Sequence, residues 1–293
     1  MNAIEIRGLT KYYGKSRGII DLNMTVLEGE FFGFIGPNGA GKSTTIRTLL
    51  GLIHSTEGSA KIFGMDIVKN KNEILAETGY LPSEALFYHG MRVKDVIRFS
   101  AELRHKNCRK EADRLCERFN LDPSKKIEEL SFGNRKKVAI VCALQHRPRL
   151  CILDEPTGGL DPLMQREFFS VLKERHKEGA TIFLSSHILS EIQHNCSRAA
   201  IIREGKIIAC DKVEALSQTN AKRVHIRGDI DISSLDHVKD IKTADHDISF
   251  LYGGDINQLI GLLSKFPVED LSVSEPDLEE IFMHYYMEGG EAK

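Results

Sequence analysis

Several features are missing from this 293-residue sequence, and each absence excludes a class of protein. Its six cysteines are scattered without a CxxC pair, so they indicate reduced structural thiols in a cytosolic protein rather than a disulfide framework or a zinc site. The formal net charge is only −2, which does not suit a bulk nucleic-acid binder, and we expect no nucleic-acid partner. There is also no internal repeat and no low-complexity tract.

Long apolar runs are absent as well. None approaches the roughly 18 residues of a membrane-spanning helix, and the first residues, MNAIEIRG, have no signal-peptide pattern. We therefore expect any work at a membrane to depend on a partner. What the chain does have is 41% hydrophobic and 28% charged residues, the composition of a soluble globular protein with a full core.

The most informative stretch is FFGFIGPNGAGKSTT, residues 31–45. An apolar run typical of a buried strand stops at Gly36, and a helical pattern begins at Lys42 after a glycine-rich loop. Residues 36–43 fit G-x-x-x-x-G-K-[ST], the phosphate-binding loop. The residues predicted to bind the nucleotide here are Asn38, Gly39, Gly41, Lys42, Ser43 and Thr44.

Each residue type in this loop suits a polyphosphate. Glycine allows the backbone to wrap closely around the phosphates, and the amides of the loop and of the helix N-terminus face the anion. Lys42 supplies a positive charge for the β- and γ-phosphates, and Ser43 supplies a hydroxyl for Mg²⁺. A chance match in a glycine-rich turn is the alternative, but the flanking strand and helix patterns argue against it. We therefore predict binding of a nucleoside triphosphate.

Strands alternate with helices along the chain, which predicts an α/β fold with a mainly parallel sheet. We expect an antiparallel β part at the N-terminus and a helical insertion over residues 83–146, where the apolar periodicity becomes helical. The core domain is predicted to cover residues 1–218, and a small α+β domain residues 219–293. The strands and helices expected in the small domain cover residues 222–227, 248–252, 256–266, 271–273 and 278–286.

Two later strand ends carry further chemistry. Asp154 and Glu155 follow the apolar run LCIL, and His187 follows the strand predicted at residues 181–184. Because ligands of such sheets bind at the carboxyl ends of the strands, we expect these side chains on the same edge as Lys42. There Asp154 would hold Mg²⁺, and Glu155 would orient or deprotonate a water that attacks the γ-phosphate. Taken separately, a solvated turn explains the two carboxylates, and packing explains the histidine.

Together these motifs carry a family resemblance: residues 3–216 are similar to the ATP-binding subunit of a bacterial ABC transporter. GPNGAGKST corresponds to the family's Walker A loop, LCILDEPTGGLD to its Walker B segment and D-loop, and LSFGN to its signature. The resemblance implies a P-loop ATPase core in which Glu155 and His187, the switch histidine, are catalytic. It also implies that Tyr13 stacks on adenine, although surface packing explains an aromatic at this position equally well.

The same resemblance implies a nucleotide site shared between subunits. Ser131 and Gly133 of the signature would contact the γ-phosphate of an ATP bound to the opposite subunit, where backbone amides suit an anion. Asp161 of the D-loop is assigned to nucleotide binding on the same basis. A head-to-tail dimer with a second, identical ATPase subunit would then enclose two ATPs.

Two departures from the family pattern bear on hydrolysis. Ser83 stands where the family has a glutamine that reaches Mg²⁺ and the attacking water. Two substitutes are open: the shorter serine hydroxyl acting through an intervening water, or the neighbouring carboxylate of Glu84 taking over part of the role. The signature reads LSFGN in place of LSGGQ, but it keeps Ser131 and Gly133. Because Glu155 and His187 are both present, we predict ATP hydrolysis, with ATP and Mg²⁺ as cofactors.

Membrane partners are also implied by the resemblance. Phe87, Tyr88 and Met91 lie where the family docks its membrane subunits, although the core of the helical insertion explains these apolar residues as well. The segment SEPDLEEIFMHYY, residues 274–286, resembles the C-terminal ending of bacterial exporter ATPases. We therefore expect a peripheral subunit on the cytoplasmic face of the cell membrane. It would drive two transmembrane permease subunits that bind and export a peptide, toxin or antibiotic.

Two other functions stay open at this stage. A soluble ABC protein acting on the ribosome or on DNA usually has two cassettes or long coiled-coil insertions, whereas this chain has one cassette and no heptad run. A regulatory module that binds ATP without hydrolysing it is the second alternative, and Ser83 is the main argument for it.

Overall fold

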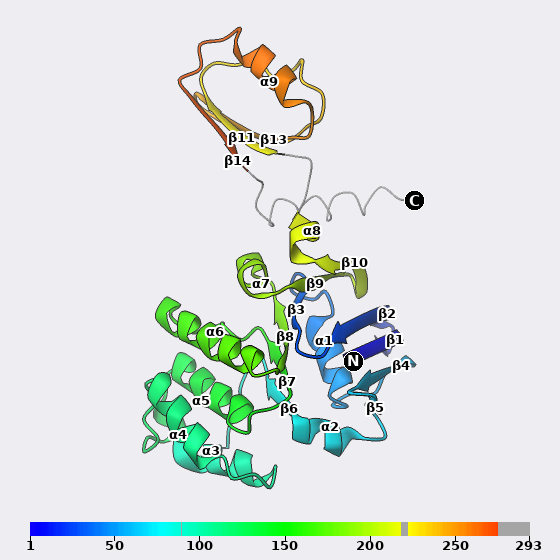
Figure 1. The fold of residues 1–293 in the computed structure, drawn as a ribbon, viewed down its shortest axis with the longest axis vertical. Coiled ribbons are helices and arrows are strands. Elements are labelled where there is room, and N and C mark those ends of the chain that lie inside the picture. The colour runs from blue at the N-terminus through cyan, green and yellow to red at the C-terminus, as the bar shows by residue number, and fades with distance from the viewer. Residues whose placement is uncertain (89, 218–221, 275–293) are drawn as a thin grey trace. The chain divides into compact units, whose positions relative to one another are not determined.

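The computed structural model describes residues 1–88, 90–217 and 222–274 (Figure 1). The chain divides into two compact units, Met1–Val213 and Glu214–Lys293. The predicted domain boundary after residue 218 stays a prediction, and each unit is described by itself below.

A six-stranded sheet forms the centre of the first unit, with the strand order β10-β9-β3-β8-β7-β6. All neighbouring strands in it are parallel except β9 and β10, which form an antiparallel hairpin through Glu204 and Gly205. The strands are β3 (Phe31–Ile35), β6 (Thr78–Leu81), β7 (Leu150–Asp154), β8 (Thr181–Ser186), β9 (Arg198–Arg203) and β10 (Lys206–Lys212). Every residue of β3, β7 and β8 is buried, as expected for strands covered on both faces. The predicted mainly parallel sheet is confirmed.

The N-terminal part is an antiparallel sheet, as predicted, with the order β2-β1-β4-β5. Its strands are β1 (Asn2–Tyr13), β2 (Ser16–Leu27), β4 (Glu57–Ile62) and β5 (Met65–Asp66). The alternation of apolar and polar residues predicts strands only at residues 3–7 and 22–26, but both strands extend to the hairpin that joins them. Tyr13 therefore lies at the end of β1 rather than in a connecting loop. The hairpin between β1 and β2 therefore fixes the position of Tyr13 opposite Ser16.

Helices of the first unit include the predicted insertion after β6, which consists of α3, α4, the 3₁₀-helix η1 and α5. The helices are α1 (Lys42–Leu49), α2 (Lys71–Glu77), α3 (Val93–Glu102), α4 (Arg109–Arg118), η1 (Ile127–Glu129), α5 (Phe132–Leu144), α6 (Pro162–Lys177) and α7 (Leu189–Asn195). Helix α6 begins at Pro162, because the side chain of Asp161 caps it by accepting a hydrogen bond from the Met164 amide and proline suits the first turn. Helices α2 and α7 are not predicted by the sequence pattern, because they are too short to show a helical period.

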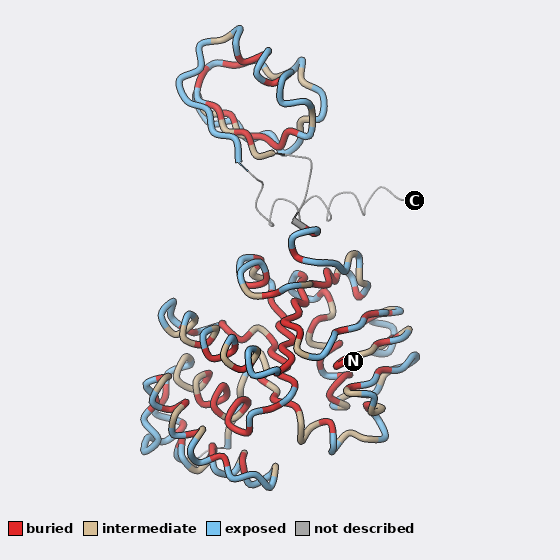
Figure 2. Tube along the Cα trace, viewed as in Figure 1, coloured by how far each residue is buried: buried red, intermediate tan, exposed pale blue. Residues whose placement is uncertain are grey.

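One hydrophobic cluster joins the antiparallel sheet, α1 and the parallel sheet. Leu9 and Leu22 of the antiparallel sheet, Ile46 and Leu49 of α1, and Phe183 of β8 are all fully buried in it. Figure 2 shows this arrangement as a continuous run of buried residues through the central strands. Packing against two sheets holds α1 in place, and with it the loop that precedes this helix.

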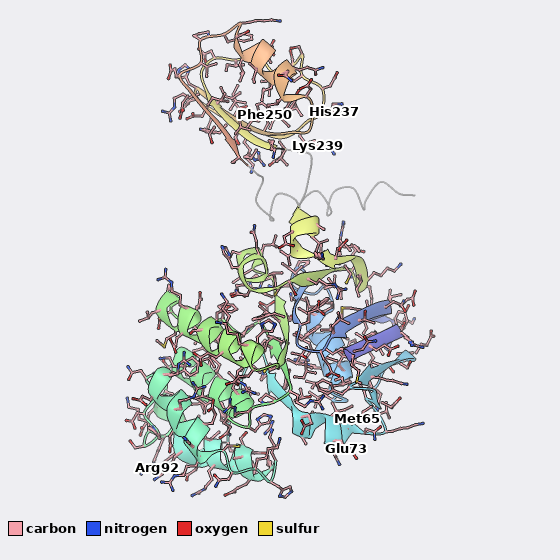
Figure 3. The ribbon with its side chains drawn as sticks, viewed as in Figure 1. Met65, Glu73, Arg92, His237, Lys239 and Phe250 are labelled. Carbon is pink, nitrogen blue, oxygen red and sulfur yellow. The ribbon has the colours of Figure 1, made fainter. Side chains whose placement is uncertain are left out.

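The second unit is a small α+β fold, as predicted. Its antiparallel sheet has the order β12-β13-β11-β14, and helix α9 (Ile256–Leu263) supplies Leu259 and Leu263 to a core around Phe250 (Figure 3). The remaining elements after Val213 are α8 (Val213–Ser217), β11 (Lys222–Arg227), β12 (Val238–Ala244), β13 (Asp247–Tyr252) and β14 (Asp270–Ser274). Strand β12 is not predicted by the sequence pattern, because its residues are almost all exposed. The helix predicted at residues 278–286 lies outside the described residues.

Candidate functional site

The predicted phosphate-binding loop connects β3 to α1 at the carboxyl edge of the parallel sheet. Gly36 passes so close to β9 that a Cβ atom there would lie 2.3 Å from the carbonyl oxygen of Ile202. Gly41 caps α1 in a left-handed conformation, with φ of 113°, which glycine adopts without steric cost. These two glycines explain why the loop can turn tightly at the point where the strand ends.

A pocket of about 280 Å³ lies against this loop. The predicted site residues that line it are Tyr13, Asn38, Gly39, Gly41, Lys42, Ser43, Thr44, Ser83 and Glu155. The structure therefore brings together residues from the β1–β2 hairpin, the loop after β3, and the segments that follow β6 and β7. Tyr13 is half-exposed, as a residue that stacks on a flat ligand must be, and the ammonium of Lys11 lies 5.5 Å from the centre of its ring.

Lys42 is buried against its own loop. Its ammonium donates hydrogen bonds to the carbonyl oxygens of Gly36, at 2.6 Å, and Pro37, at 3.2 Å. The same Nζ atom lies 3.1 Å from Oε1 of Glu155, in an ion pair that lacks the angle of a hydrogen bond. The loop thus fixes the cation, while its contact with Glu155 is the one that a phosphate oxygen could replace.

Glu155 follows β7 directly and has a left-handed backbone with φ of 48°, which costs a non-glycine residue roughly 1–2 kcal/mol. Its amide donates a hydrogen bond to the Ser185 carbonyl at 3.0 Å, which ties this backbone to β8. Its other carboxylate oxygen, Oε2, lies 2.6 Å from Nδ1 of the half-exposed His187. Glu155 and His187, which the sequence predicts at the same sheet edge, are therefore in direct contact, and Lys42 contacts the other carboxylate oxygen.

Asp154 is fully buried beside this pair. Burial raises the pKa of its carboxyl, while hydrogen bonds from the hydroxyls of Ser43 and Ser185 oppose the rise. Ser185 Oγ lies 3.2 Å from Oδ1, and Oδ2 has no hydrogen-bond partner among the described residues. A buried carboxylate oxygen without a partner, next to the Ser43 hydroxyl, is the set of hard oxygen donors that Mg²⁺ prefers. The residues present therefore fit this cation.

Ser131, Gly133 and Asp161 do not line the pocket around Lys42. Ser131 is exposed and caps α5 by accepting a hydrogen bond from the Asn134 amide at 3.3 Å. Gly133 lies so close to the segment before α6 that a Cβ atom would be 2.5 Å from the Gly159 carbonyl oxygen. Within one chain, these three residues therefore lie outside the pocket that Lys42 lines.

Lys136 of α5 is a site residue that the sequence analysis missed. It is 2% exposed, and its ammonium donates to the carbonyl oxygens of Pro82 at 3.0 Å, Ser83 at 2.9 Å and Glu155 at 3.1 Å. Burial lowers the pKa of Lys136 to about 8, although the charges of Asp154 and Glu155 oppose this shift. In the sequence, Lys136 stands four residues before Ile140 and therefore on the same, buried face of α5. A lysine among the apolar residues of that face is the feature that could have identified it.

Arg17 also lines the pocket and was missed. It lies in β2 across from Tyr12, and its guanidinium is 3.2 Å from the carboxylate of Glu204. A basic residue close to Tyr13 in the same hairpin was the signal that could have found it. Together with Lys42 it gives the pocket a second positive charge, which suits a polyphosphate.

The parallel sheet, the glycine loop before α1 and the carboxylates after β7 define a P-loop nucleoside-triphosphate-binding protein. Comparison with known proteins narrows this class. The family model for ABC transporters matches residues 19–158. The chain is 40% identical to the bacitracin transport ATP-binding protein BcrA of Bacillus licheniformis over 225 residues, which cover 75% of this chain and 72% of that protein. This chain belongs to the ABC transporter family, as an ATP-binding subunit.

Two further comparisons agree with this assignment. The linearmycin resistance ATP-binding protein LnrL of Bacillus subtilis is 30% identical over 308 residues, covering 96% of this chain and 97% of that protein. A solved structure of an ATP-binding subunit of an ABC transporter superposes with a TM-score of 0.69 and 30% identity, covering 73% of this chain and 91% of the other. Subunits of this family hydrolyse ATP and work with membrane permease subunits. Within the part of the chain that the structure describes, no helix has the length and apolar character needed to cross a membrane.

Proposed function

We propose that this chain hydrolyses Mg²⁺-ATP on the cytoplasmic face of the membrane to drive export of an antibiotic or peptide. The observation that carries the proposal is the placement of the Glu155 carboxylate between Lys42, at 3.1 Å, and His187, at 2.6 Å. Relatives named for bacitracin transport and for linearmycin resistance support the class of cargo. The relatives' names and the site contacts give no support to a ribosome-directed, DNA-directed or non-hydrolysing module.

Binding of the triphosphate is assigned to the loop before α1. Its backbone amides and the ammonium of Lys42 contact the phosphates, and Tyr13 stacks on the base. Ser43 and Asp154 would hold the cation, and Ser83, at the edge of the pocket, would reach it through a water. Bound Mg²⁺ would neutralise part of the charge on the phosphates.

The carboxylate of Glu155 takes the proton-accepting role. When phosphate oxygens bind the ammonium of Lys42, the ion pair between Lys42 and Glu155 breaks. Oε1 of Glu155 is then free to orient and deprotonate the attacking water. His187 keeps its contact with Oε2 and holds the carboxylate in place. In this way ATP binding itself releases the base from its ion pair.

Closure of the site is assigned to a second, identical subunit. Ser131, Gly133 and Asp161 lie outside their own chain's pocket, and Ser131 is exposed at the N-terminus of α5, where amides suit an anion. We assign these residues to the ATP bound by the partner subunit in a head-to-tail dimer that encloses two nucleotides.

Contact with two permease subunits is assigned to the segment before α3. Leu86 and Tyr88 are 90% and 73% exposed there, so their apolar surface is available to a partner. Phe87 and Met91 of the same segment are only partly exposed, which agrees with a role in the insertion's own packing.

The test is ATP turnover of the purified assembly with Glu155→Gln. We expect a loss of about 100-fold or more, since an amide cannot accept the water's proton. The matched control is Glu73→Gln, which changes an exposed carboxylate on α2 (Figure 3) and should leave turnover unchanged. If Glu155→Gln turns over ATP at the wild-type rate, the assigned role of this carboxylate is wrong.

A further inference from the structure

Lys136 is the buried cation of α5 whose ammonium contacts the backbone of two separate loops. It donates to the carbonyl oxygens of Pro82 and Ser83, after β6, and of Glu155, after β7. The three distances lie between 2.9 and 3.1 Å, so each donor proton of the ammonium has an acceptor. Within the described part of the chain no carboxylate forms an ion pair with this ammonium, which makes its burial costly and indicates a specific use.

The contact with Glu155 bears on the geometry of the base. Because Glu155 has a left-handed backbone, its conformation persists only if its surroundings hold it. Two hydrogen bonds do so: its amide donates to Ser185, and its carbonyl accepts from Lys136. The bond to Ser185 joins Glu155 to the neighbouring strand β8, whereas the bond from Lys136 joins it to α5 of the helical insertion.

The contact with Ser83 involves the backbone and not the side chain. The Ser83 carbonyl accepts from Lys136 at 2.9 Å, while the residue itself lines the same pocket as Glu155. The helix that carries Lys136 begins just after Ser131, so the ammonium joins three parts of the site. These parts are the segment after β6, the segment after β7 and the start of α5.

We propose that Lys136 is a positioning residue that sets the backbone of Ser83 and Glu155 relative to α5 and so aligns the base for hydrolysis. This inference rests on the proposed role of Glu155. The ammonium touches neither the nucleotide loop nor the Glu155 carboxylate, so it acts on hydrolysis through the backbone and leaves ATP binding to the loop before α1. Any movement of α5 would reach Glu155 through this contact.

Lys136→Met in the full assembly removes the ammonium and keeps a long apolar side chain. We expect kcat to fall about 10- to 100-fold, since misplacing a reacting group or removing its support costs that much. The dissociation constant for ATP should stay within about twofold, because it depends on the loop before α1. The matched control is Lys137→Met, which removes a partly exposed charge from the next position of α5 and should leave kcat unchanged. Lys136→Gln, whose amide can donate to two carbonyls, should retain more activity than Lys136→Met.

Three outcomes would overturn the inference: an unchanged kcat for Lys136→Met, a parallel loss of ATP affinity and melting temperature, or an equal loss in the Lys137→Met control. A double variant tests the route of action. If Lys136 works through Glu155, adding Lys136→Met to Glu155→Gln should lower the residual rate by less than about twofold, and a full further loss would contradict this route. Failure of the proposed function is distinguishable, because it appears as wild-type turnover in Glu155→Gln alone.

Discussion

His146 provides a test of the fold's electrostatics that is independent of catalysis. It follows α5, is 5% exposed, and its Nε2 atom lies 3.3 Å from the carbonyl oxygen of Thr78, while Nδ1 has no partner among the described residues. Burial lowers the pKa of His146 from 6.5 to about 3, and the nearby charge of Arg104 adds to the shift. The histidine is therefore neutral in the folded protein over the whole physiological range.

The expected effect follows from proton linkage. Between pH 6.5 and about 3 the unfolded chain binds a proton at this position that the folded chain does not, so stability falls as the pH falls. At pH 5 the difference is about 1.5 pH units, which at about 1.4 kcal/mol per unit amounts to about 2 kcal/mol. Near pH 7.5 the contribution is close to zero.

The perturbation is His146→Gln, which keeps a donor for the Thr78 carbonyl and removes the titrating group. The free energy of unfolding is measured in urea by far-UV circular dichroism, since the chain has no tryptophan to report by fluorescence. Between pH 7.5 and pH 5, the wild type should lose about 2 kcal/mol more than the variant. Equal losses in the two proteins would refute the reasoning, because the remaining titrating groups are common to both.

Three other substitutions test the nucleotide site. Gly36→Ala places a Cβ atom 2.3 Å from the Ile202 carbonyl oxygen, so it should cost more than about 2 kcal/mol in unfolding experiments and weaken ATP binding. Gly39→Ala, with φ of 79° and no atom within 4 Å of its Cβ, should cost only about 1 kcal/mol, and equal costs would contradict the steric argument. Asp154→Asn should abolish the strengthening of ATP binding by Mg²⁺, measured by titration with Mg²⁺ and with EDTA. An unchanged Mg²⁺ dependence would remove Asp154 from the cation site.

Much of the site could be predicted because it is built from short contiguous motifs at strand ends. The glycines of residues 36–43 indicate a tight loop, and the apolar runs before this loop and before Asp154 indicate buried strands. The rule that parallel strands end at one edge was then sufficient to predict that Glu155 and His187 lie near Lys42. The 2.6 Å contact between Glu155 and His187 is the structural counterpart of that prediction.

What the sequence could not show depends on contacts between distant segments. Lys136 contacts Pro82 and Ser83 only because the helical insertion folds back so that α5 packs next to the segment after β6. The sequence pattern does not show which residue of α5 lies next to that segment. Arg17 enters the pocket because the β1–β2 hairpin is longer than the alternation of apolar residues indicates. Strand β12 is exposed along most of its length, so it lacks the alternating pattern that marks a half-buried strand.

The departure at Ser83 has a structural answer in the same contacts. A family member with glutamine at this position uses a side chain that serine lacks, but Lys136 holds the carbonyl of Ser83, which every residue type provides. The backbone of the segment after β6 is therefore held at the site whichever side chain it carries. The backbone of Glu155 is fixed from two sides, by Ser185 and by Lys136. Among the described residues, the side chains within ion-pair distance of its carboxylate are Lys42 and the half-exposed His187. In the mechanism proposed above, the backbone of Glu155 therefore stays in place while its carboxylate exchanges Lys42 for the attacking water when ATP binds.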